Sequence, residues 1–239
     1  MPDRKLFQQT PELVKRYTRR KIVSLSRPLA RFILRPYLIA RERKKIRSTE
    51  KALSSVRALI SRCEREGYVH LSRIANAALY ITMAELDTAH IKVAALTTHN
   101  EWKRKLYIRL FILLMFENKI REIFDKEFYL SLEMLKVPRG LIGDLKDYVR
   151  QYNRSHEKFR KKYNSIRVET LAHRNGNATT SYKMIRLLKE EDAIGDIADL
   201  YSTLNLVLPL LVKIIRIGGN FESVEKLKST LRKTADQVE

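Results

Sequence analysis

The run LYIRLFILLMF, residues 106–116, is one of the two longest apolar stretches of the chain. Its apolar side chains fall on nearly every side of a helix rather than on one stripe, and Arg109 is its only charged residue. We therefore expect a helix whose middle is buried on several sides by other helices. The run is shorter than the roughly 20 residues that cross a bilayer, so we interpret it as a core helix. The second run, LNLVLPLLVKIIRI at residues 204–217, is interpreted in the same way.

The sequence on both sides of this run also predicts helices. Apolar residues recur at spacings of 3 and 4, the alternating pattern of a β-strand is absent, and the chain has only 7 Gly and 6 Pro. The expected helices, with Ser48 or Thr49 and then Asn100 as N-caps, cover approximately residues 49–66, 71–97, 101–136, 141–174, 182–188, 192–217 and 223–234. Pro209 is expected to kink the sixth helix, and the pair Gly218 and Gly219 to end it.

These helices predict an all-α fold in which an antiparallel helical bundle covers residues 48–239. Residues 1–47 are expected to form a basic helical arm or extension, broken into short pieces by Pro28 and Pro36. The single cysteine, Cys63, fits a buried position and a reducing compartment. The N-terminal residues lack the apolar core of a secretory signal, and the expected location is the cytoplasm.

The formal net charge is +21, and most of the excess lies in the N-terminal part of the chain. Residues 1–67 hold 19 Lys and Arg against 6 Asp and Glu, whereas residues 68–239 hold 29 against 21. The densest cluster is RERKKIR at residues 41–47. A charge of this size indicates the kind of partner rather than the fold. Within the cluster, the candidate contacts to RNA are Lys44, Lys45 and Arg47.

Three interpretations of this charge stay open. It can bind the phosphates of RNA or DNA, it can form a solvated face with no specific partner, or it can meet an anionic membrane surface. The membrane interpretation depends on apolar residues that recur at helical spacing between arginines, namely Phe32, Ile33 and Tyr37.

The only tryptophan, Trp102, stands at the start of the helix expected at residues 101–136, next to three basic residues. A tryptophan in such a place can stack on a nucleobase. Since tryptophan is mostly buried in folded proteins, we expect it to pack instead.

A further stretch, RVETLAHRNGNA at residues 167–178, places Arg167 six positions before His173. The spacing alone carries no information, because Arg150 and His156 have the same spacing. The context of His173 is more distinctive. Ala172 removes bulk beside the ring, the histidine lies within a turn of the expected helix end, and the apolar helix that follows can pack back onto it.

With this context, the stretch resembles the signature of the HEPN superfamily (higher eukaryotes and prokaryotes nucleotide-binding domain). It is especially similar to HEPN proteins of bacterial abortive-infection systems. The similarity covers approximately residues 100–217, and its specific part is Arg167 with residues 172–175. Family members usually carry a polar residue, often Asn, directly after the arginine, where this chain has Val168.

The resemblance implies a HEPN-like bundle that forms a homodimer and, in active members, a metal-independent endoribonuclease without a cofactor. It implies that His173 is the general acid or base and that Arg167 holds the scissile phosphate, with Arg174 and Asn175 as substrate contacts. A polar residue on the earlier long helix sometimes assists, and the candidates are Glu117, Asn118 and Arg121. The implied setting is a toxin or an anti-phage defence effector, with an antitoxin or another protein as a possible partner.

The residue types suit this chemistry. Histidine titrates near neutral pH and can give or take a proton, and arginine stays charged and grips phosphate through two N–H groups. One histidine cannot be acid and base at once, so a dimer that supplies two would complete the site. No His or Cys pair has zinc-binding spacing, and no Walker or GxGxxG loop occurs.

Other interpretations stay open. Arg167 can pair with Glu169 or with a neighbouring helix, and His173 can bind the last carbonyl groups of its own helix. The protein would then be a non-catalytic HEPN-like module that binds RNA or protein, or a basic helical adaptor at a membrane surface.

Overall fold

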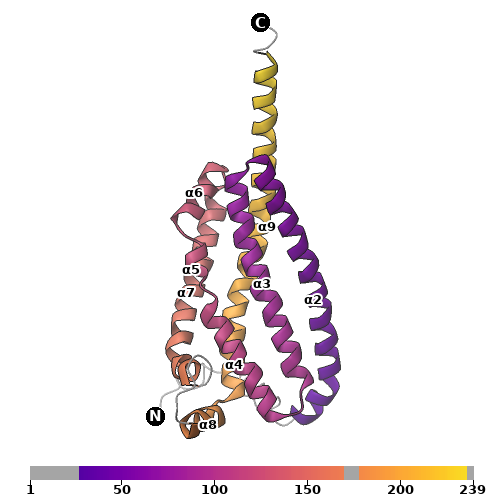
Figure 1. Cartoon of the computed structure of the whole chain (residues 1–239), viewed down its shortest axis with the longest axis vertical. Helices are drawn as coiled ribbons and strands as arrows, with labels where there is room; N and C mark the ends of the chain where they lie inside the picture. Colours follow the sequence, from indigo (N-terminus) through magenta and orange to yellow (C-terminus); the bar gives the residue numbers. More distant parts are fainter. Residues whose placement is uncertain (1–26, 170–177, 236–239) are drawn as a thin grey trace, which may run out of the picture.

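The computed structural model describes residues 27–169 and 178–235, and every regular element in this part of the chain is a helix (Figure 1). The expected all-α fold is therefore confirmed. The helices are α2 (Arg27–Glu66), α3 (Val69–Thr97), α4 (Glu101–Glu117), α5 (Ile120–Ile123), α6 (Lys126–Met134), α7 (Arg139–Arg167), α8 (Ala178–Leu187) and α9 (Glu190–Ala235).

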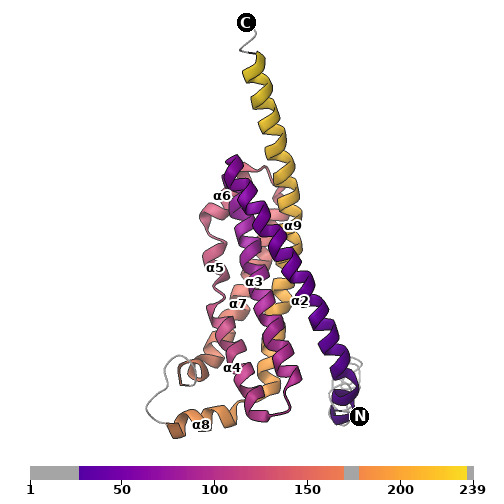
Figure 2. The same ribbon diagram turned by 45° about the vertical axis from the view of Figure 1, so that its right-hand side comes forward.

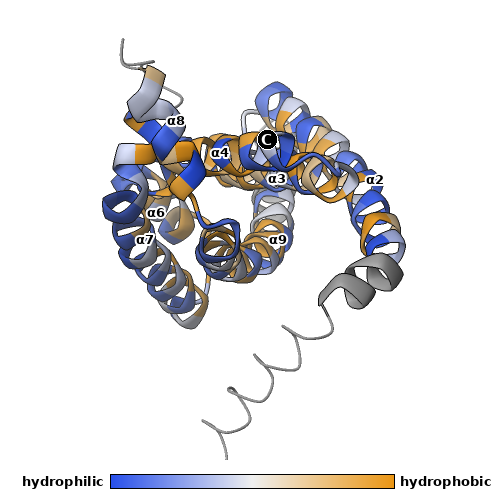
Figure 3. Ribbon diagram, turned by 90° about the horizontal axis from the view of Figure 1, so that it is seen from below, coloured by the Kyte–Doolittle hydropathy of each residue, from blue (hydrophilic) through white to orange (hydrophobic). Residues whose placement is uncertain are grey.

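The helices form an elongated bundle whose two ends differ. The beginnings of α4 and α9 lie near α8 at one end, and α6 lies near the turn between α2 and α3 at the other (Figures 1 and 2). Seen end-on, α2 lies at one side of the bundle and α7 at the opposite side, with α3 and α9 between them (Figure 3). α8 thus meets the start of α4 at one end of the molecule, whereas the last turn of α7 contacts the end of α4.

The first two helices form an antiparallel pair joined by a tight turn. Gly67 ends α2 with a φ of 76°, a backbone conformation that glycine adopts without steric cost, so the predicted stop is confirmed. α2 passes through Pro36 and through residues 48 and 49 without interruption. The predicted start at Ser48 or Thr49 is therefore wrong, and so is the predicted break at Pro36.

The helix continues through these residues because α3 packs along it. Ile46, Ile60 and Cys63 are buried in their contact, and Lys92 of α3 pairs with the buried carboxylate of Glu42. Tertiary packing of this kind outweighs the lower intrinsic helix propensity of Pro36 and of residues 48 and 49. The described part of the expected arm, residues 27–47, is consequently continuous with the bundle.

The apolar run at residues 106–116 forms most of α4 and lies in the core, as predicted. Ile108, Ile112 and Met115 are 3%, 0% and 0% exposed. α3, α7 and α9 pack against the helix from different sides. Asn100 caps it by accepting a hydrogen bond from the backbone N–H of Lys103 at 3.0 Å, which confirms the predicted N-cap.

The single helix predicted for residues 101–136 is wrong, because the chain breaks into α4, α5 and α6. Asn118 ends α4, and its side chain is buried. Asp125 then starts α6, since its carboxylate accepts a hydrogen bond from the backbone N–H of Phe128 at 2.7 Å. The break directs Phe124 and Phe128 into the core, where their rings meet edge to face at 4.7 Å.

The C-terminal helix α9 runs without interruption from Glu190 to Ala235, so the predicted stop at Gly218 and Gly219 and the separate last helix are wrong. A Cβ atom at Gly218 would lie 2.9 Å from Leu135 Cδ1 and 3.2 Å from Leu71 Cδ1. The glycine therefore permits close packing against α3 and the end of α6 rather than a turn. Beyond this contact, α9 extends past the rest of the bundle (Figure 1).

Residues 190–223 of α9 are long and apolar enough to cross a membrane, by length and composition. This is weak evidence, since a core helix passes the same test. Seven side chains of this segment are buried in the hydrophobic core of the bundle: Ala193, Ile197, Leu200, Leu204, Val207, Leu211 and Ile214.

Candidate nucleic-acid interface

Arg167 lies in the last turn of α7, and its side chain reaches the C-terminal end of α4. Its Cζ atom is 5.2 Å from the centroid of the Phe116 ring, and Nη2 is 3.8 Å from Glu117 Oε1. The side chain is 31% exposed, and its Nε is buried without a hydrogen-bond partner among the described residues. An ion pair of this length near the surface is weak. A phosphate can therefore compete with Glu117 for the guanidinium group.

Beyond Arg167, the chain stays helical for two more residues in a wider, π-type turn. Val168 is half-buried there, and its backbone N–H donates to the carbonyl groups of Asn164 and Ser165. α8 is tied to this turn because the Ser181 hydroxyl donates to the Glu169 carbonyl at 2.8 Å. The other residues of the stretch, Ala172, His173, Arg174 and Asn175, lie outside the described residues.

Of the three polar residues expected to assist, Glu117 is the one that contacts Arg167. Asn118, the next residue, is 3% exposed, and its Nδ2 has no hydrogen-bond partner among the described residues. Arg121 lies on the exposed side of α5. The sequence could not choose among the three, because the choice depends on where α4 ends.

The pair with the same spacing, Arg150 and His156, has a structural role. His156 is buried, donates a hydrogen bond from Nε2 to the Met115 carbonyl at 2.7 Å, and stacks on Tyr152 at 5.5 Å. Burial lowers the pKa of His156, and the neighbouring Arg160 adds to the effect. Arg150 instead pairs with Asp147 at the surface, at 2.8 Å. The two side chains therefore do not form one site.

The three residues of the basic cluster that were predicted to contact RNA differ in their exposure and in their partners. Lys44 and Arg47 are exposed on α2. Lys45 instead faces α3 and α9, with Nζ 2.7 Å from Glu85 and 5.8 Å from the centroid of the Tyr201 ring. Lys45 thus contributes to packing, whereas Lys44 and Arg47 are free to meet a ligand. Tyr37 is 65% exposed, as a membrane-facing arm would require, while the side chains of Phe32 and Ile33 lie outside the described residues.

A second basic surface lies on α7 and was missed from the sequence. The outer side of this helix is mainly hydrophilic (Figure 3). Arg150, Arg154 and Lys158 follow one another at spacings of four and line an open hollow of about 420 Å³ with Asp147. The i, i+4 spacing of these basic residues could have predicted this surface from the sequence, because residues four apart share one helix face.

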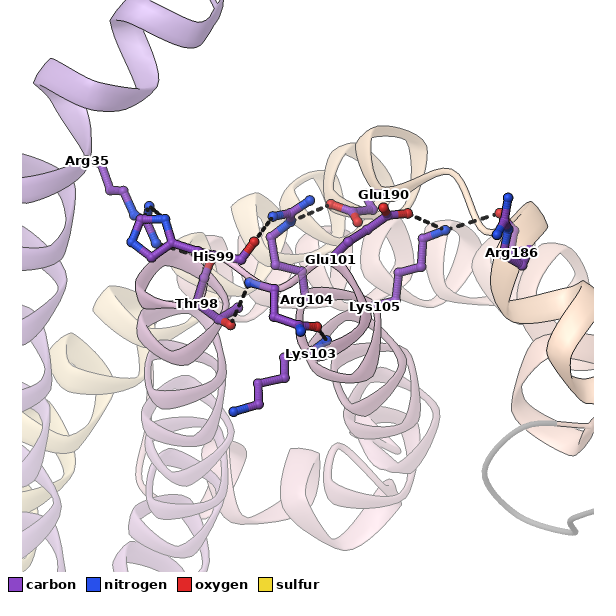
Figure 4. A network of polar contacts seen from close by, with 10 residues as sticks. Arg35, Thr98, His99, Glu101, Lys103, Arg104, Lys105, Arg186 and Glu190 are labelled. Atoms are coloured by element: carbon purple, nitrogen blue, oxygen red, sulfur yellow. Dashed lines mark hydrogen bonds and ion pairs between the residues drawn. The ribbon is translucent and has the colours of Figure 1, made fainter.

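The first helical turns of α4 hold a polar network at the end of the bundle near α8 (Figure 4). Arg104 pairs with Glu190 of α9 at 3.2 Å, and Lys105 pairs with Glu101 at 3.1 Å. Lys105 also donates a hydrogen bond to the carbonyl of Arg186 in α8. The hydrogen bond from Lys105 lowers the pKa of the Glu101 carboxylate.

Trp102 is not packed in the interior as expected. Its side chain is 46% exposed and stacks on Tyr182 of α8, with the ring centroids 5.9 Å apart and the planes at 27°. The sequence could not show this, because Tyr182 follows 80 residues later and only the fold brings α8 to the start of α4.

Among the described residues, no group of three or more His, Cys, Asp or Glu side chains is placed to hold a metal ion. Compared with protein-family models, curated proteins and solved structures, the chain has no significant match in any of the three.

Proposed function

We propose that the protein binds RNA through its exposed basic surfaces and cleaves it without a metal ion, as the resemblance to HEPN proteins implies. The observation that carries the proposal is the position of Arg167. It stands at the end of α7 with a weak ion pair to Glu117, next to the stretch that holds His173. The exposed cations of α2 and α7 supply the affinity for a polyanion.

The chemistry assigned to the two residues follows from their side chains. His173 takes the proton from the 2′-hydroxyl that attacks the neighbouring phosphate, or gives one to the departing 5′-oxygen. Arg167 exchanges Glu117 for the phosphate and stabilises the charge that develops on it. A homodimer, in which each copy supplies one histidine, provides acid and base together. The proposed setting is a cytoplasmic toxin or defence effector held in check by a protein partner.

The test is cleavage of total RNA in the presence of EDTA by the wild type and by His173→Ala. His90→Ala is the matched control, because His90 is exposed on α3 and lies outside the proposed site. We expect cleavage by the wild type and by the control, and at least a 100-fold slower reaction by His173→Ala. Equal cleavage by wild type and His173→Ala would remove the assignment.

The cleavage assay, with an RNA-binding assay beside it, separates the main alternative, a non-catalytic HEPN-like module. In that case the wild type retains RNA in a binding assay but leaves its length unchanged over hours. A protein that neither retains nor cleaves RNA would contradict both forms of the proposal.

A further inference from the structure

Two aromatic rings from distant parts of the chain form an exposed stack at the end of the bundle. Trp102 belongs to the first turn of α4 and Tyr182 to α8, and the side chains are 46% and 50% exposed. Rings of this size bury large apolar areas in most proteins, so two half-exposed rings in contact form an apolar surface that the described fold leaves uncovered.

The surroundings hold the two rings in place. Lys105, which is 7% exposed, links α4 to α8 by donating to the carbonyl of Arg186 at 3.2 Å. Arg186 in turn lies over the Tyr182 ring at 6.0 Å and donates to the Tyr182 hydroxyl at 3.3 Å. The stack is thus braced by cations from both helices.

Beside the rings lies an open hollow of about 300 Å³. Its lining combines the two aromatic rings with side chains that donate or accept hydrogen bonds: Asn100, Glu101, Lys105 and Arg186. This volume is at the lower end of the range for small-ligand pockets. A flat ring with a polar edge fits such a lining.

We propose that the Trp102–Tyr182 stack is the binding site for one unpaired nucleobase of an RNA strand. The base extends the stack of the two rings, and the Arg186 guanidinium meets the adjoining phosphate. Stacking on aromatic side chains beside cations is how proteins hold single-stranded RNA with little sequence preference. This inference rests on the proposed RNA binding and names the part of the RNA that this end of the bundle recognises.

The charge of the molecule favours a base over an aromatic or apolar peptide side chain. The chain carries a net charge of +21, and Lys183 and Arg186 lie exposed on α8 beside the stack. The carboxylate of Glu101 forms an ion pair with Lys105 at 3.1 Å, which offsets its negative charge. A polyanion is therefore attracted to this end of the bundle, whereas a neutral peptide gains nothing from the cations.

The experiment uses the fact that Trp102 is the only tryptophan of the chain. Its fluorescence is followed while the full-length protein with His173→Ala, which leaves the RNA intact, is titrated with a ten-residue oligoadenylate or with an abasic ribose-phosphate oligomer of the same length. Binding of both oligomers is measured in parallel by anisotropy of a 5′ label. We expect the oligoadenylate to quench Trp102 to saturation and the abasic oligomer to bind without quenching.

Two variants make the test sharper. Tyr182→Ala is expected to weaken binding of the oligoadenylate by about 5- to 100-fold and to leave the abasic oligomer unaffected. Leu130→Ala is the control, because Leu130 is 46% exposed, close to the 50% of Tyr182, and lies on α6 at the opposite end of the bundle (Figure 1). We expect no change in binding for this variant. Circular dichroism checks that both variants keep the helical fold.

The outcomes separate the two proposals. Anisotropy that shows RNA binding, with equal quenching by both oligomers or no effect of Tyr182→Ala, overturns the base site while RNA binding stands. In that case the aromatic pair serves another partner, such as a protein. No binding of either oligomer contradicts the proposed RNA binding itself, and the base site with it.

Discussion

Single residues with similar sequence contexts have different roles in this fold. Lys44 and Lys45 are neighbours in one basic cluster, yet Lys44 faces solvent and Lys45 pairs with Glu85 of the adjacent helix α3. His156 and His173 both follow an arginine by six positions, yet His156 is a core residue held by the Met115 carbonyl. At this scale the residue type is known from the sequence, but its partner is not.

The buried His156 makes a prediction about the pH dependence of stability. Its pKa is lowered in the folded protein, chiefly by burial, from the ordinary value of about 6.5. Near and below pH 6.5, the unfolded chain therefore binds more protons than the folded protein. The contribution of His156 to the free energy of unfolding is thus fully present above pH 6.5. It is lost as the pH falls from there through the lowered pKa of the folded state.

The measurement is urea unfolding of the wild type and of His156→Gln at pH 7.5, 6.5 and 5.5. Glutamine keeps an N–H donor for the Met115 carbonyl and does not titrate. We expect the free energy of unfolding to fall more steeply between pH 7.5 and 5.5 for the wild type than for the variant. Parallel pH profiles would show that His156 titrates as in the unfolded chain.

At the scale of elements, the helices follow their apolar faces more closely than their local stop signals. Gly67 stops α2, whereas Gly218 and Gly219 do not stop α9. The difference is that a turn after Gly67 allows α3 to pack back on α2, while the residues around Gly218 are held by Leu71 and Leu135. Packing of the neighbouring helix therefore decides whether a glycine ends a helix or sits inside it.

Two glycines of α9, one with open space around it and one in close contact with leucines, are predicted to respond differently to replacement by alanine. Gly195→Ala adds a methyl group that meets nothing within 4 Å, so it should raise the free energy of unfolding by about 1 kcal/mol through helix propensity. Gly218→Ala gains the same propensity, but its methyl group would crowd Leu135 and Leu71. Overpacking costs about 1–3 kcal/mol, so we expect no gain or a loss.

Thermal and urea unfolding of both variants beside the wild type measure this difference. The expected order of stability is Gly195→Ala, then wild type, then Gly218→Ala at or below it. An equal gain in both variants would mean that the leucine side chains move aside freely, contrary to their burial at 2% and 1% exposure.

For the whole molecule, the distribution of charge predicts how RNA binding responds to salt. Each cation that meets a phosphate of single-stranded RNA adds about 0.7 to the slope of log affinity against log salt concentration. Replacing both Lys44 and Arg47 with Gln should lower the slope by about 1.4 if both contact phosphate. Lys45→Gln should leave the slope unchanged and lower the stability by at most about 1 kcal/mol, because it removes an ion pair within the fold.

The slope is measured by anisotropy of a labelled single-stranded RNA over a series of KCl concentrations, with His173→Ala present in every protein so that the RNA stays intact. A urea unfolding curve is recorded for each variant. Equal slopes for the wild type and the double variant would exclude this part of α2 from the interface. A large change in slope for Lys45→Gln would contradict its assignment to packing.

The sequence by itself determined the all-α class, the buried helix at residues 106–116, the N-cap at Asn100 and the stop at Gly67. These features depend on side-chain periodicity and on hydrogen bonds between residues a few positions apart. The same local information led to errors at residues 48, 118 and 218, where packing between helices overrides it.

Only the tertiary structure decided which side chains of different helices meet. It brought Arg167 to Glu117 and Trp102 to Tyr182, pairs that lie 50 and 80 positions apart in the chain. It also gave the adjacent Lys44 and Lys45 different surroundings, because Lys45 pairs with Glu85 of α3 whereas Lys44 faces solvent. The physical reason is that helix periodicity defines the faces of each helix, whereas contacts between helices depend on how all these faces are buried together.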